Sequence, residues 1–212
     1  MSRYPRGTVE LSLASIRGDG PLAGGARAVE RLVTATLLWP RPLIAERNAA
    51  RTFTFSPEGL DLHERDWTDR ILFKETVEGP FGLVLQVTEG LTATQIGKLA
   101  AAFGAAMLRT AGTELGRLAA DPWSAALIRF PLQHLAGELG GVGKAPAVVA
   151  AGAVTLRPGH ATPIHLPLSV PADITRVRRS GSPGRVRTRR EIRHRAGAPA
   201  GTARVDATYY RA

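Results

Sequence analysis

The spacing of apolar residues changes twice along this 212-residue chain, and each change limits the folds available to it. In residues 8–13 apolar and polar side chains alternate, with Val9, Leu11 and Leu13 on one face, which is typical of a half-buried β-strand. From residue 92 the spacing lengthens to the helical period, and after Pro146 the strand-like pattern returns. The order is therefore strands, then helices, then strands again.

Five strands are predicted in the first 90 residues, at 8–13, 29–39, 51–55, 70–77 and 82–88. The last two flank Glu78, Gly79 and Pro80, so we expect them to be paired with each other. The final strand would place Leu83, Leu85 and its other odd-numbered apolar residues on a single face.

Residues 91–143 carry the signals of a helical hairpin. Thr92 and Gln95 have the spacing of a capping box, and apolar residues follow at helical intervals. Asp121 followed by Pro122 predicts the start of a second helix, and a Gly-rich run from residue 140 to 143 predicts its end.

Strands are predicted again at 148–156, 164–170, 174–179, 185–194 and 203–209. Pro163, Pro167 and Pro171 favour an edge position for the second of these, because proline lacks the amide that a central strand needs. The predicted fold is a single α+β domain over residues 1–212. It consists of an antiparallel β-sheet or β-sandwich with a helical hairpin insertion. Residues 1–90 and 144–212 would be its β-rich halves.

Two segments resemble paired strands of a C2-like β-sandwich domain, namely residues 70–89 (RILFKETVEGPFGLVLQVTE) and 148–170. Such modules often act as docking scaffolds for membranes or proteins. Calcium-binding members of that group use several loop aspartates, and the acidic loop from Glu58 to Asp69 does not match a calcium-binding spacing. The resemblance therefore implies a calcium-independent member.

Positive charge is concentrated at the C-terminal end. From Arg157 onward there are twelve arginines, no lysine and three acids, whereas the preceding 156 residues hold sixteen basic and fifteen acidic side chains. Genomic codon bias accounts for the preference for arginine over lysine, but it does not account for the clustering. Such a distribution attracts anionic partners whatever the fold.

The predicted strands at 174–179 and 185–194 form an arginine-rich hairpin around the connection at residues 180–184. If residues 185–195 are extended, the odd-numbered arginines lie on one face, and this face suits phosphate or carboxylate groups. The candidate binding residues are Arg176, Arg178, Arg179, Arg185, Arg187, Arg189, Arg190, Arg193 and Arg195. Three interpretations remain open: contact with a polyanion, contact with an acidic protein partner, or a charged edge that prevents aggregation.

The remaining motifs favour no catalytic or metal site. Residues 140–144 resemble a phosphate-binding loop, but Glu138 and Ala145 break its pattern. His160 and His165 lack a third metal ligand nearby. The acidic loop at residues 58–69 is a candidate counterweight to the basic hairpin, and its Trp67 either covers the end of the sheet or serves as an exposed docking anchor. No cofactor is expected.

Cysteine is absent, the first residues lack the apolar run of a secretion signal, and no apolar stretch is long enough to cross a bilayer. We therefore expect a cytoplasmic protein without a transmembrane segment. Its expected role is that of a non-enzymatic assembly or scaffold subunit, an oligomer or complex member that contacts other protein subunits through the hairpin. The alternative is a nucleic-acid-binding accessory protein that contacts phosphates through the same hairpin.

Overall fold

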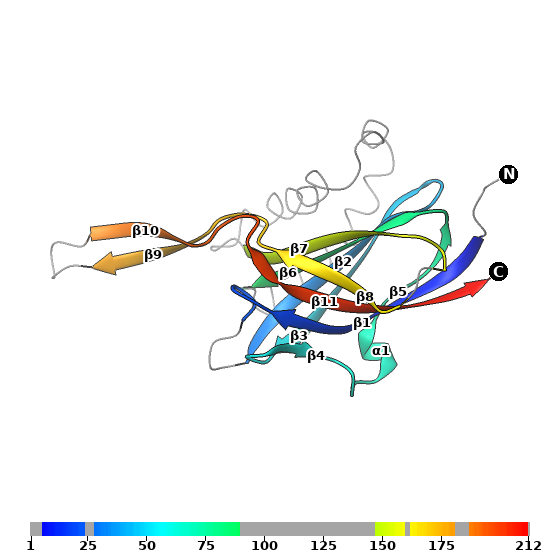
Figure 1. Cartoon of the computed structure of the whole chain (residues 1–212), viewed down its shortest axis with the longest axis horizontal. Helices are drawn as coiled ribbons and strands as arrows, with labels where there is room; N and C mark the ends of the chain where they lie inside the picture. The colour runs from blue at the N-terminus through cyan, green and yellow to red at the C-terminus, as the bar shows by residue number, and fades with distance from the viewer. Residues whose placement is uncertain (1–5, 24–27, 90–146, 160–161, 181–186, 212) are drawn as a thin grey trace.

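The structure, a computed structural model, describes residues 6–23, 28–89, 147–159, 162–180 and 187–211 (Figure 1). The predicted α+β class is wrong, because strands make up 74% of these residues and helix only 3%, in the single short helix α1 (Trp67–Arg70). No helical hairpin occurs within the described ranges, and residues 91–143, for which it was predicted, lie outside them.

Nine antiparallel strands form one curled, half-barrel sheet (Figure 1). Its order is β3-β2-β6-β7-β8-β11-β1-β4, with β5 also paired to β1. Both β-rich halves of the sequence contribute to it, because β6 pairs with β7 and β1 pairs with β11. The strands are β1 (Arg6–Gly18), β2 (Val29–Arg41), β3 (Ile44–Phe55), β4 (Gly59–Asp61), β5 (Ile71–Glu78), β6 (Phe81–Glu89), β7 (Ala147–Leu156), β8 (Ile164–Ser169) and β11 (Pro199–Arg211).

A β-bulge explains why β1 extends beyond the predicted residues 8–13. Val9, Leu11 and Leu13 face the core, and the register then shifts between Leu13 and Ser15, so that Ile16 is the next residue on the same face. Bulges increase local twist and bend a strand. Similar shifts occur in four other strand pairs of this sheet, which together favour its curl.

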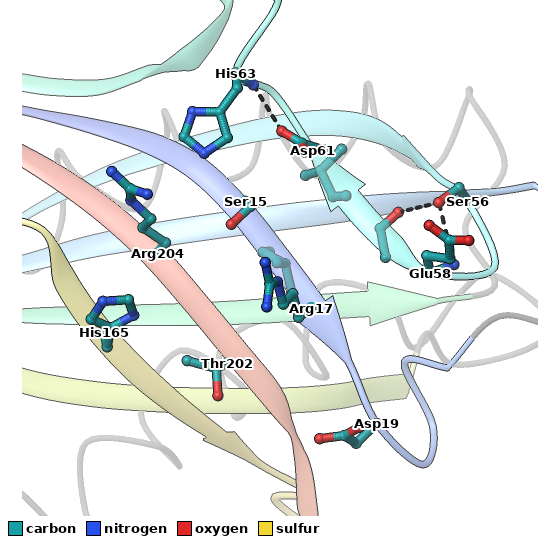
Figure 2. Close-up of a pocket in the computed structure, with 13 residues that line it drawn as sticks. Ser15, Arg17, Asp19, Ser56, Glu58, Asp61, His63, His165, Thr202 and Arg204 are labelled. Carbon is teal, nitrogen blue, oxygen red and sulfur yellow. Dashed lines mark hydrogen bonds between the residues drawn. The ribbon is translucent and has the colours of Figure 1, made fainter.

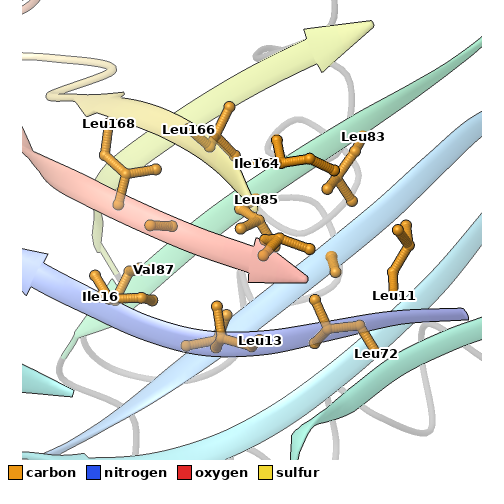
Figure 3. Close-up of a cluster of buried hydrophobic side chains, with 14 of the residues drawn as sticks. Leu11, Leu13, Ile16, Leu72, Leu83, Leu85, Val87, Ile164, Leu166 and Leu168 are labelled. Carbon is orange, nitrogen blue, oxygen red and sulfur yellow. The ribbon is translucent and has the colours of Figure 1, made fainter. Parts of the chain in front are cut away.

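The described residues on the concave face of the sheet form a hydrophobic core (Figure 3). Leu83, Leu85 and Val87 of β6 share this face as predicted, and they pack with Leu11 of β1 and Leu166 of β8. β2 and β6 are buried on both faces, since residues between the core positions, such as Thr34 and Gln86, are buried as well.

β5 and β6 exist as predicted, but their expected pairing is wrong. β5 pairs with β1, whereas β6 lies between β2 and β7. The short connection at residues 79–80 thus links strands that are not hydrogen-bonded neighbours. Consequently residues 70–89, which carried part of the C2-like resemblance, do not form a hairpin.

The predicted edge position of β8 is wrong. β8 lies between β7 and β11 in the sheet order, yet its ladder with β7 consists of one pair, Ala151 with Ser169. Pro167 offers no amide, and an added Cβ at Gly152 would lie 2.4 Å from the Pro167 carbonyl oxygen. The two strands therefore approach closely without continuous backbone hydrogen bonding.

Side-chain ion pairs join the two ends of the curled sheet. Glu75 of β5 accepts a hydrogen bond from Nε of Arg47 on β3 at 3.1 Å, and its other oxygen lies 3.7 Å from a guanidinium nitrogen of Arg41 on β2. The Glu75 side chain is 17% exposed, so these contacts form in a partly desolvated setting.

A separate two-stranded ribbon, β9 (Ile174–Ser180) and β10 (Arg187–His194), extends beyond the end of the half-barrel (Figure 1). It is inserted between β8 and β11, so it continues the course of two strands that are anchored in the core. The predicted strands at 174–179 and 185–194 are confirmed to within two residues. Residues 181–186, which connect β9 and β10, lie outside the described ranges.

Candidate functional site: the arginine ribbon

The two segments that connect the arginine ribbon, defined as β9 and β10, to β8 and β11 are joined to each other by hydrogen bonds. Val170 is buried, its amide donates to the carbonyl of Ala198 at 2.9 Å, and its carbonyl accepts from Gly197 at 2.8 Å. Asp173 accepts a hydrogen bond from the amide of Ala196 at 2.8 Å through Oδ1. These contacts hold the two connecting segments together where the ribbon leaves the sheet.

The ribbon presents two different faces. Directly opposed residues of an antiparallel pair lie on the same face, so Arg176, Arg189 and Glu191 share one face. The other face carries Val177 and Ile192, which are diagonal neighbours and are 49% and 53% exposed. One face is therefore charged, and the other combines an apolar pair with Arg190, which lies opposite Val177.

The predicted binding residues are distributed along this ribbon and its base. Arg176, Arg189, Arg190, Arg193 and Arg195 are exposed. Three further predicted residues, Arg178, Arg179 and Arg187, lie in the paired strands. Arg185 lies outside the described ranges.

A register shift interrupts the alternation that was predicted for residues 185–195. Ile192 pairs with Thr175, but the next pair is His194 with Ile174, so Arg193 is the extra residue of a bulge. Arg195 follows the end of β10. The predicted row of odd-numbered arginines on one face therefore does not continue past Glu191.

Among the described side chains, carboxylates compensate little of this charge. Of Arg176, Arg189, Arg190 and Arg193, whose side chains the structure describes, Arg189 alone forms an ion pair, with Glu191 at 4.0 Å, and its side chain is 82% exposed. The paired strands contain seven arginines and a single acid. The ribbon is thus a cationic surface available to another molecule.

A second charged surface, the acidic segment (residues 58–69), lies at the β1 edge of the sheet. It includes β4 and the first residues of α1. Its five acids, Glu58, Asp61, Glu64, Asp66 and Asp69, are all exposed. No ion pair of theirs is formed with another described residue, and Trp67 is 58% exposed, as the docking-anchor interpretation expected.

An open groove of about 810 Å³ adjoins the acidic segment (Figure 2). The register places His165, Arg204, Ser15 and Asp61 opposite one another on β8, β11, β1 and β4. Strands in a sheet are about 4.8 Å apart, so this row spans roughly 14 Å. Because these residues alternate with core residues along their strands, the groove lies on the outer face of the sheet.

The groove is lined by both carboxylates and basic groups. Asp19, Glu58 and Asp61 supply the carboxylates, while Arg17 and Arg204 supply the guanidiniums. Nε of Arg204 is already engaged by Asp206 at 3.3 Å. In the described residues no cluster of acids and histidines has the geometry of a metal site. We regard the groove as a mixed-charge surface suited to another charged chain.

Arg31 is buried at one end of the half-barrel and has a structural explanation. Its guanidinium donates to the carbonyls of Leu22 at 2.9 Å and Pro21 at 3.2 Å, and it lies 5.1 Å from the centre of the Phe55 ring. Burial lowers the pKa of Arg31, and Glu89 at 3.9 Å partly opposes this shift. The side chain holds the loop before β2 against the core.

Sequence reasoning missed the exposed pair of Val177 and Ile192 as a docking feature. The alternation along the two predicted strands was a usable signal for their shared face. Their exposure could not be predicted, because it depends on the ribbon being separate from the sheet. It also missed the groove, because Ser15, Asp61 and Arg204 are far apart in the sequence and meet only through strand order.

Comparisons with known proteins identify no family for this chain: no protein-family model and no curated protein matches it. Within the described ranges, no helix combines the length and apolar character needed to cross a bilayer.

Proposed function

We propose that this protein is a non-enzymatic assembly subunit whose arginine ribbon docks onto an acidic protein surface. The observation that carries the proposal is the ribbon itself, which projects from the half-barrel with a charged face and an apolar pair. An isolated two-stranded ribbon is only marginally stable in water. A partner that covers Val177 and Ile192 would supply the missing packing.

The apolar pair favours a protein partner over nucleic acid. Protein interfaces combine an apolar centre with arginine, whereas a phosphate backbone offers guanidiniums charge but gives Val177 and Ile192 nothing apolar to bury. The exposed face of Arg176 and Arg189 still supports nucleic-acid binding as the second candidate function, since guanidiniums bind phosphate in a bidentate manner.

The test is native mass spectrometry of the protein purified at about 0.1 M salt after co-expression with its genomic neighbours, because pairs of exposed charges remain attractive at that ionic strength. We expect a protein complex that is lost in the variant Arg176→Ser/Arg189→Ser/Arg190→Ser. The matched control, Arg6→Ser/Arg157→Ser/Arg211→Ser, removes the same charge from exposed positions elsewhere and should retain it. A complex that survives the ribbon variant would contradict the proposal.

A second variant separates the two candidate functions. Val177→Ser/Ile192→Ser removes the apolar pair and keeps every arginine. If the partner is a protein, this variant loses the complex. If the partner is nucleic acid, it still binds duplex DNA with an affinity that falls steeply as salt is raised, and the three-arginine variant does not.

A further inference from the structure

Two surfaces of this one chain carry opposite charge, and among the described side chains neither is neutralised. The arginine ribbon holds seven arginines against one acid, whereas the acidic segment holds five acids against one arginine, Arg65. In the described ranges no ion pair joins the two surfaces. Each surface therefore offers what the other lacks.

The two surfaces also match in their apolar groups. Val177 and Ile192 are exposed on the ribbon, and Trp67 is exposed in the acidic segment. Large exposed side chains surrounded by charge are typical of the centre of a protein interface, where aromatic residues and arginine provide much of the binding energy.

The fold keeps the two surfaces apart within one molecule. The ribbon continues β8 and β11, whereas the acidic segment is attached to β1 through β4. Figure 1 shows the ribbon reaching past the end of the sheet, away from α1. The two surfaces can therefore meet only between molecules.

We infer that the acidic partner of the ribbon is the acidic segment of a second copy of this chain; this inference rests on the proposed docking function. The groove beside Glu58 and Asp61 gives that copy a concave surface for extended arginine side chains. Because the contact joins two different surfaces, it is a head-to-tail contact, which generates a ring if the rotation closes and a filament if it does not.

The first experiment measures the mass of the purified full chain by light scattering over a salt series. The chain should be oligomeric at about 0.05 M salt and approach its monomer mass of 22.6 kDa at about 0.5 M, because salt screens exposed charges beyond a Debye length. A mass that does not change with salt would overturn the inference.

Two charge-reversed variants test which surfaces meet. Arg176→Glu/Arg190→Glu inactivates the ribbon, and Glu64→Lys/Asp66→Lys inactivates the acidic segment. Each variant alone should be monomeric. An equimolar mixture retains one intact contact, so it should form a 1:1 dimer and nothing larger. The control Arg157→Glu/Arg211→Glu should oligomerise like the unmodified protein.

A chain that carries all four reversals retains neither surface. Its ribbon has five arginines against three acids and its acidic segment has three acids against three basic residues, so it should stay monomeric with its thermal unfolding unchanged. Assembly of this chain at about 0.05 M salt would overturn the inference. So would a mixture of the two variants that stays monomeric.

Failure of the inference can be distinguished from failure of the proposed function. If the chain is monomeric at low salt but native mass spectrometry finds a ribbon-dependent complex with a different protein, the second copy is the wrong partner and the docking function stands. If neither complex forms, both are wrong.

Discussion

Arg31 is a buried charged residue at the end of the half-barrel, and its hydrogen bonds explain why its burial is tolerated. Its guanidinium is 3% exposed and donates hydrogen bonds to two backbone carbonyls, those of Leu22 and Pro21. A buried charge is tolerated only when such partners are present, and removing it leaves them without donors.

We predict that Arg31→Met destabilises the protein by about 3 kcal/mol, because methionine fills similar space but leaves the carbonyls of Pro21 and Leu22 unpaired and removes the partner of Glu89. Urea unfolding followed by circular dichroism measures this change. Arg51→Met, at a partly exposed position, is the control and should change stability by less than about 0.5 kcal/mol.

Gly201 permits close contact between β11 and β1. Its φ is +139°, and an added Cβ would lie 2.2 Å from the carbonyl oxygen of Arg17. We predict that Gly201→Ala lowers the free energy of unfolding by at least about 2 kcal/mol, through steric overlap added to backbone strain. Gly197 also has positive φ, but a Cβ added there would have no atom within 4 Å, so Gly197→Ala measures the strain alone. Equal losses in the two variants would contradict the steric explanation.

At the scale of elements, strand positions could be predicted from the sequence far better than strand partners. Alternation located β5 and β6 because a strand shows its buried face locally. Their partners are strands from other parts of the chain, and the local sequence pattern does not specify which strand pairs with which. The extension of β1 was missed for a related reason, since the bulge at Leu13 reverses the alternation before Ile16.

In the candidate site, too, local features could be predicted from the sequence and features that depend on strand pairing could not. The arginine hairpin could be predicted because its charge, turn residues and strands are contiguous. The bulge at Arg193 could not, because it depends on how β10 pairs with β9. The groove could not either, because neighbouring strands from distant parts of the chain supply Ser15, Asp61 and Arg204.

The contact between β5 and the β2–β3 hairpin gives an element-scale prediction. Glu75→Gln keeps the shape of the side chain but removes the charge that binds Arg47 and Arg41, so we expect a loss of about 2 kcal/mol in unfolding free energy. A double-mutant cycle with Arg47→Gln measures the coupling. Additive losses would show that the two side chains act independently.

The connection between the ribbon and the half-barrel gives a second element-scale prediction. Asp173→Ala removes the acceptor of the Ala196 amide, so the ribbon should become less restrained relative to the half-barrel. Spin labels at Thr188 on the ribbon and Thr155 on β7 should show a broader distance distribution in this variant. Asp173→Asn retains an Oδ1 acceptor and should preserve the narrow distribution. An unchanged distribution in Asp173→Ala would contradict the restraining role.

At the scale of the whole molecule, the half-barrel supports the arginine ribbon and, at a different edge, the acidic segment. The buried core anchors β8 and β11, and the arginine ribbon extends from the ends of these two strands. If the ribbon docks as proposed, this arrangement separates stability from binding. Variants of exposed ribbon arginines should alter association and its salt dependence while leaving the unfolding of the sheet almost unchanged.

The claim that the ribbon is the docking surface is tested most directly by placing a photo-crosslinking amino acid at Ile192 and irradiating the cells that make the protein. We predict crosslinks to an acidic protein surface, with residues 58–69 of a second copy as the expected target. Crosslinks should be absent when the same group is placed at exposed Thr155 on β7. The claim would be contradicted if Ile192 gave no protein crosslink, or if Arg176→Ser/Arg189→Ser/Arg190→Ser left the crosslink unchanged.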